Sequence, residues 1–96
     1  MKMKLTQNEA KLMMIVAADE YNTLNGDYRK AETRADLQTL SSVPEWAQEM
    51  GLTKPQTKGV LGSLCAKGLL TVDGVGADSD VCFTEAGFDY ILDYIR

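Results

Sequence analysis

The residues best suited to binding chemistry lie between positions 53 and 67, where Lys54, Gln56 and Lys58 alternate with other residue types. Lysine can contact guanine edges or phosphates, and glutamine can pair bidentately with adenine in the major groove of DNA. The start of a helix also favours a phosphate through its unpaired backbone N–H groups and its dipole. These are the residue types that direct readout of DNA uses, and no acid lies among them.

An ordinary solvated helix surface is the alternative interpretation, since lysines are common on any exposed helix face. Gly59 and Gly62 argue against it, because two glycines inside a helix cost about 2 kcal/mol relative to alanine. With Ser63 and Ala66 they form a stripe of small residues beside the lysines. A phosphate strand, another helix or a partner protein could approach this backbone closely. Close packing of the stripe against the first helix of the same chain is equally compatible with the sequence.

Charge is distributed unevenly along the chain. The net charge is −4, yet residues 51–72 contain three lysines and no acid. If each of these lysines neutralises one phosphate, the logarithm of DNA affinity should fall with the logarithm of salt concentration with a slope of roughly −3. The C-terminal part is acidic by contrast, with these residues before Arg96: Asp73, Asp78, Asp80, Glu85, Asp89 and Asp93.

Length and composition indicate a single folded domain over residues 1–96. Hydrophobic residues make up 45% of the chain, which is enough for a packed core. No apolar run approaches the about 20 residues that cross a bilayer. The start, MKMKLTQNEAK, has polar residues where a signal peptide has an apolar stretch. We therefore expect a cytoplasmic protein without a membrane partner.

The residue types needed for most enzyme and metal chemistry are scarce. Histidine is absent, and Cys65 and Cys82 are the two cysteines. Two thiolates cannot complete a four-ligand zinc site, and the usual general base is missing. We expect both thiols to be reduced and packed in the core. The sequence predicts no catalytic residues, no metal, no cofactor and no enzyme activity.

The lysine-containing segment falls in the second of two short predicted helices. Residues 43–50 place apolar side chains at spacings of three and four, and the glycine that follows ends this helix. Thr53 followed by Gln56 is the pattern of a capping box, so a second helix begins at residue 54 and continues to Lys67. Two helices joined by so short a turn form a helix-turn-helix unit over residues 43–67.

A first helix precedes this unit. Thr6 and Glu9 form another capping-box pattern, and an apolar stripe at helical spacing continues from there through Ala18 to Tyr21, which predicts a helix of that length. Because this helix is apolar on most sides, we expect it to lie in the middle of the domain.

The remaining elements are short strands and a last helix. Residues 23–40 form a variable connection that ends in a short strand at 37–40. Residues 69–72 and 81–84 have the alternating pattern of two paired strands, with glycines and aspartates between them. These strands form a hairpin over residues 69–84, and an amphipathic helix follows it.

The order of helix, short strand, helix-turn-helix, two-stranded wing and C-terminal helix resembles the winged helix-turn-helix domains of bacterial and phage regulators, the MarR type among them. The resemblance lies in VPEWAQEMGLTKPQTKGVLGSLCAKGLL and in FTEAG. In that family a Gly-Leu-Ser/Thr turn, a Leu-x-x-x-Gly-Leu helix exit and a Thr-x-x-Gly after the wing recur, which here are residues 51–53, 64–69 and 84–87. The resemblance implies an α+β winged-helix fold and a small transcriptional regulator that binds DNA through helix 54–67. In that geometry the inward residues are Leu52, Thr57, Val60, Leu61 and Leu64, and the outward residues are Lys54, Pro55, Gln56, Lys58, Gly59, Gly62 and Ser63. The outward residues, together with Thr53 and Lys67, are the candidate DNA contacts.

A protein–protein interaction module is the alternative function. MarR-type regulators are longer and add helices that build a dimer, and their wings usually carry basic residues where this hairpin carries aspartates. An acidic hairpin and last helix could instead meet a basic partner protein, helped by electrostatic steering. Two tyrosines four residues apart, away from the apolar face of the last helix, could also serve a homodimer contact. The candidate partner or dimer contacts are Asp78, Asp80, Tyr90 and Tyr94.

Overall fold

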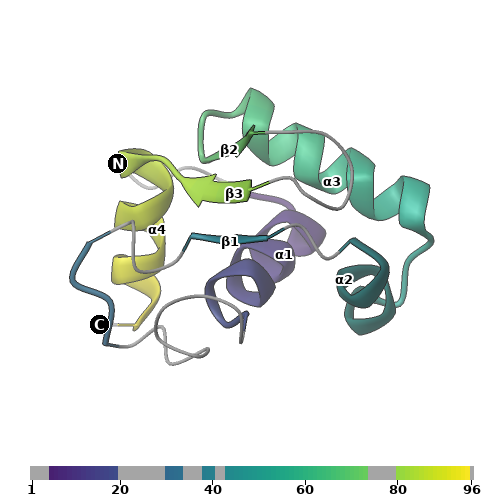
Figure 1. Ribbon diagram of the computed structural model, residues 1–96, viewed down its shortest axis with the longest axis horizontal. Helices are drawn as coiled ribbons and strands as arrows, with labels where there is room; N and C mark the ends of the chain where they lie inside the picture. Colours follow the sequence, from purple (N-terminus) through teal and green to yellow (C-terminus); the bar gives the residue numbers. More distant parts are fainter. Residues whose placement is uncertain (1–4, 20–29, 34–37, 41–42, 74–79, 96) are drawn as a thin grey trace.

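Helix α1 lies in the middle of the structure and contacts the other three helices. The computed structural model describes residues 5–19, 30–33, 38–40, 43–73 and 80–95. Figure 1 shows α2 at one end of the long axis and α4 at the other, with α1 and the sheet between them. Within the described residues the elements are α1 (Gln7–Ala17), β1 (Thr39–Leu40), α2 (Val43–Met50), α3 (Lys54–Ala66), β2 (Leu70–Asp73), β3 (Asp80–Phe83) and α4 (Glu85–Ile95). The α+β architecture predicted from the sequence is therefore present.

Helix α1 begins with the predicted capping box. The Glu9 N–H donates to Thr6 Oγ1 at 3.2 Å, and the Thr6 N–H donates to Glu9 Oε1 at 2.9 Å. Both bonds satisfy backbone donors that a helix start otherwise leaves unpaired. Four apolar side chains of α1 are completely buried: Leu12, Met13, Val16 and Ala17. The central position expected for this helix is confirmed.

The C-terminal end of α1 comes earlier than the apolar stripe predicts. The helix ends at Ala17, and Ala18 is its exposed C-cap. The Asp19 N–H then bonds to the carbonyl of Val16, three residues back, at 3.3 Å, which tightens the last turn. The prediction that the helix includes Ala18 is wrong, and Tyr21 lies outside the described residues.

Helices α2 and α3 are joined by the short turn that the sequence predicts. Gly51 adopts φ 69°, a left-handed conformation that favours glycine, and the Leu52 N–H bonds back to the Ala47 carbonyl at 3.0 Å. Trp46 anchors α2, since only 2% of its surface is exposed. Its indole N–H donates to Asp19 Oδ2 at 3.0 Å and ties α2 to the end of α1.

The three strands form an antiparallel sheet in the order β1-β3-β2. In the register, Leu70 lies opposite Phe83 and Asp73 lies opposite Asp80. Both hairpin strands are displaced by one residue from the predicted ranges 69–72 and 81–84. Leu69 and Thr84 lie just outside the paired strands and are joined by a backbone hydrogen bond, in which the Thr84 N–H donates to the Leu69 carbonyl at 3.1 Å.

Thr84 and Gly87 explain the Thr-x-x-Gly motif after the hairpin. The Thr84 hydroxyl donates to the Gly68 carbonyl at 2.5 Å and accepts the Gly87 N–H at 3.1 Å, so it connects the end of α3 to the start of α4. A Cβ atom at Gly87 would lie 2.0 Å from the Leu69 carbonyl oxygen. The motif therefore allows α4 to pack directly against the backbone that follows α3.

Candidate functional site

One face of α3 is exposed and carries two lysines one helical turn apart. Lys54 and Lys58 are both exposed, whereas Thr57 and Leu64 are completely buried and Leu61 is nearly so. The predicted division of α3 into an inward and an outward face is confirmed for these residues. Other predicted contact residues that are exposed are Thr53, Pro55, Gln56, Gly59, Gly62 and Lys67.

The side chain of Gln56 takes part in the cap of α3. Its Oε1 accepts the Thr53 N–H at 2.9 Å, while the Gln56 N–H donates to Thr53 Oγ1 at 3.2 Å. Bidentate pairing with adenine requires both the oxygen and the nitrogen of a glutamine amide. Gln56 would therefore have to give up its capping bond before it could read a base in this way.

The glycines on the outward face of α3 have open space beside them in the described part of the structure. A Cβ atom built on Gly59 or on Gly62 would have nothing within 4 Å other than its own helix backbone and chain neighbours. Close packing of these two glycines against α1 is therefore excluded within the described residues, although Ser63 of the same stripe does contact α1. The exposed backbone at these two positions is accessible from outside.

Glu9 joins α1 to the C-terminal half of α3 through a buried carboxylate. The residue is 3% exposed. Ser63 Oγ donates to Glu9 Oε2 at 2.5 Å, and Lys67 Nζ donates to Glu9 Oε1 at 2.6 Å. Ser63, which we expected to point outward, thus faces α1 instead. Lys67 keeps 35% of its side chain exposed, but its ammonium group is paired with this carboxylate.

The surroundings of Glu9 stabilise its ionised form. The Lys67 ammonium, the Ser63 hydroxyl and the Thr6 backbone N–H together lower the pKa of Glu9 from 4.5 to about 2, although burial acts in the opposite direction. The sequence identifies Glu9 only as a capping residue, and such residues are commonly solvated. Its second role depends on Ser63 and Lys67, which lie 54 and 58 positions further along the chain. Local sequence patterns do not reveal contacts over such separations.

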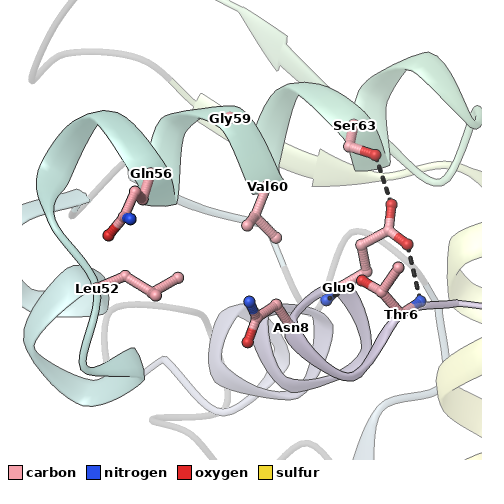
Figure 2. A pocket seen from close by; sticks show the side chains of 8 residues that line it. All are labelled: Thr6, Asn8, Glu9, Leu52, Gln56, Gly59, Val60 and Ser63. Carbon is pink, nitrogen blue, oxygen red and sulfur yellow. Dashed lines mark hydrogen bonds between the residues drawn. The ribbon is translucent and has the colours of Figure 1, made fainter.

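A groove of about 350 Å³ runs between the first turn of α1 and the outward face of α3. Figure 2 shows Val60 pointing from α3 toward α1, with Leu52 beside it and Asn8 across from it on α1. The hydrogen bond between Ser63 and Glu9 lies at one end of the groove. In this groove the apolar side chains of Leu52 and Val60 thus lie between polar side chains, next to the exposed backbone of Gly59.

The residues predicted for partner or dimer contacts are not brought together as one surface in the described part. Asp80 lies in β3 and is half-buried, directly opposite the exposed Asp73 of β2. Tyr90 is half-buried and packs against the core, so the prediction that it lies away from the apolar face is wrong. Asp78 and the side chain of Tyr94 lie outside the described residues.

Metal and thiol chemistry have little support in the described residues. They contain no group of three His, Cys, Asp or Glu side chains arranged to hold a metal ion. Cys65 and Cys82 are thiols that are half-buried rather than fully enclosed in the core. Burial raises the pKa of Cys65, which disfavours its reactive thiolate form. Among the same residues, no helix has both the length and the apolar character required to cross a membrane.

No protein-family model, curated protein or solved structure matches this chain. The geometry and charge of α3 are therefore the basis on which a function can be argued.

Proposed function

We propose that this protein is a small winged helix-turn-helix regulator that binds double-stranded DNA with α3 in the major groove. The observation that carries this proposal is the outward face of α3, where Lys54 and Lys58 are exposed beside the accessible backbone of Gly59 and Gly62. No acid occurs between residues 51 and 72 in a chain of net charge −4. The order of elements and the three-residue turn before α3 agree with such a fold.

The proposed contacts differ in kind along α3. Lys54 and Lys58 bind phosphates or guanine edges, since both are exposed and lie on the same side of the helix. Thr53 and Pro55 lie at the helix start, where the helix dipole favours a phosphate; Pro55 has no N–H, and the N–H groups of Thr53 and Gln56 are bonded in the capping box. Gly59 and Gly62 let the sugar-phosphate backbone approach the helix closely. With so few cations, one domain binds weakly, and useful affinity requires two copies on half-sites about 34 Å apart or a partner already on DNA.

The test is binding of the purified protein to random-sequence duplex DNA at about 50 mM salt, where non-specific dissociation constants in the micromolar range are expected. Lys58→Glu should abolish this binding, because it places a carboxylate on the proposed contact face. Lys30→Glu is the matched control, since it changes the net charge equally at an exposed position outside α3. Segment 30–33 lies at the opposite end of the long axis from the start of α3 (Figure 1). Equal losses for both variants, or no binding by the wild type, would refute the proposal.

A protein-interaction module is the second candidate, and one observation favours it. Asp73 and Asp80 lie directly opposite each other in the hairpin, although like charges at such positions destabilise a strand pair. A hairpin of this charge would be repelled by a duplex and attracted by a basic protein surface. Asp73→Lys separates the two functions: it should strengthen DNA binding under the first proposal and weaken capture of a basic partner under the second.

A further inference from the structure

The further inference concerns Glu9, and it rests on the proposed DNA-binding function. We propose that Glu9 is a positioning residue for the DNA-binding surface. By holding Ser63 and Lys67 against α1, it confines the charged contacts of α3 to Lys54 and Lys58. The helix then meets DNA through its N-terminal half alone.

Both oxygens of the Glu9 carboxylate are engaged in the folded protein. Oε1 accepts from the Thr6 N–H at 2.9 Å and from Lys67 Nζ at 2.6 Å, and Oε2 accepts from Ser63 Oγ at 2.5 Å. A carboxylate that is only 3% exposed needs a cation nearby, because water does not stabilise its charge. If Lys67 moved to a phosphate, this buried charge would lose its counter-ion. We therefore expect Lys67 to bind the buried Glu9 carboxylate more strongly than a solvated phosphate.

The pairing of Lys67 with Glu9, the Glu9–Lys67 clamp, also limits the length of the basic surface on α3. Lys58 and Lys67 are nine residues apart, which corresponds to about 13 Å along a helix. With Lys67 paired, the cations on α3 cover a single turn at its start. DNA binding should then release counter-ions from about two phosphates rather than three.

Salt dependence measures the number of lysines that contact phosphates. With two contacts, wild-type affinity for duplex DNA should fall about 12-fold between about 50 mM and 200 mM salt, following a slope near −1.8. Glu9→Gln keeps the shape of the side chain and releases Lys67, so the fall should increase to about 40-fold. A purely structural role for Glu9 would lower affinity at every salt concentration and leave this ratio unchanged.

Lys67→Ala completes the cycle of variants. In the wild-type background it should leave the ratio near 12-fold, and in the Glu9→Gln background it should return the ratio from about 40-fold to about 12-fold. If Lys67→Ala alone reduced the wild-type ratio by about 3.5-fold, from about 40-fold to 12-fold or from about 12-fold to 4-fold, Lys67 would be a phosphate contact and the inference would be overturned.

A second measurement needs neither DNA nor a variant. An amine-acylating reagent, followed by peptide mass spectrometry, should modify Lys67 of the wild type at least several-fold more slowly than Lys54 and Lys58, because its amine must first leave the carboxylate. Equal rates for all three lysines would overturn the inference even if DNA binds. Slow labelling of Lys67 without any DNA binding would leave the Glu9–Lys67 clamp intact, while the proposed function and the positioning role of Glu9 would both fall.

Discussion

The α-carbon of Gly87 points at the backbone carbonyl of Leu69, and a Cβ atom there would lie 2.0 Å from the carbonyl oxygen. Real Cβ contacts are essentially never shorter than 3.0 Å. The start of α4 and the exit from α3 can therefore approach each other only because residue 87 is a glycine.

Gly87→Ala should destabilise the protein by on the order of 3 kcal/mol, because the clash involves backbone that cannot rotate away. Urea unfolding followed by fluorescence of Trp46, which is the only tryptophan in the chain and is buried, measures this loss. Gly62→Ala is the matched control, since the methyl group that it adds would have nothing within 4 Å outside its own helix backbone and chain neighbours. A loss below about 1 kcal/mol for Gly87→Ala would show that α4 can move away from the Leu69 carbonyl at little cost.

Gly59→Ala and Gly62→Ala should each stabilise the protein by about 1 kcal/mol, since alanine is the better helix former and has open space at both positions. The same variants should weaken DNA binding, because the added methyl groups keep the DNA backbone away from α3. Stability is read from urea unfolding and affinity from titration with duplex DNA. Greater stability with unchanged affinity would mean that no ligand approaches this backbone closely.

The ion pair of Glu9 and Lys67 should make stability depend on pH in the acid range. The pKa of Glu9 is lowered from 4.5 to about 2 in the folded protein, mainly by Lys67. Its ionised form therefore stabilises the fold fully above about pH 4.5, and this contribution is lost as the pH falls toward 2. Glu9→Gln lacks the contribution at every pH. Urea unfolding at neutral pH and near pH 2.5 should show a large difference between wild type and variant that shrinks in acid, and a constant difference would contradict the assignment.

The bond between the Trp46 indole and Asp19 should contribute about 1 to 2 kcal/mol, since it joins a charged acceptor to a buried donor. Asp19→Ala leaves the indole N–H without this acceptor and should lower the free energy of unfolding by that amount. Asp19→Asn keeps an oxygen in place and should cost less. Near-ultraviolet circular dichroism and urea unfolding would test both variants. Equal losses of unfolding free energy in the two variants would indicate that the charge of Asp19, and not its bond to Trp46, stabilises the fold.

Local signals predicted most of the helices and turns correctly. Thr53 and Gln56 form the expected capping box, and Gly51 and Gly68 have the positive φ angles, 69° and 75°, with which helices commonly end. These features depend on hydrogen bonds within four or five residues, which the sequence displays directly. Element ends were less predictable, since α1 stops at Ala17 although apolar spacing continues beyond it.

The candidate site was only partly visible in the sequence. The exposed positions of Lys54 and Lys58 follow from helical periodicity, because a neighbouring set of apolar residues must face the core. The burial of Glu9, by contrast, arises where α1 and α3 pack. Lys67 is therefore paired with a carboxylate, although the sequence presents it as one of three similar lysines. No spacing rule connects positions so far apart in the chain.

The sequence by itself determined where α1 and α3 start, where α2 stops, which face of α3 is apolar, and that one basic segment lies within an acidic chain. Local hydrogen bonding and side-chain period suffice for these properties. Only the tertiary structure decided that Lys67 is paired with Glu9, why residue 87 is a glycine, and that a Cβ atom on Gly59 or Gly62 would meet open space in the described fold. Each of these depends on how separate elements approach one another in space, and that approach is set by packing of the whole core.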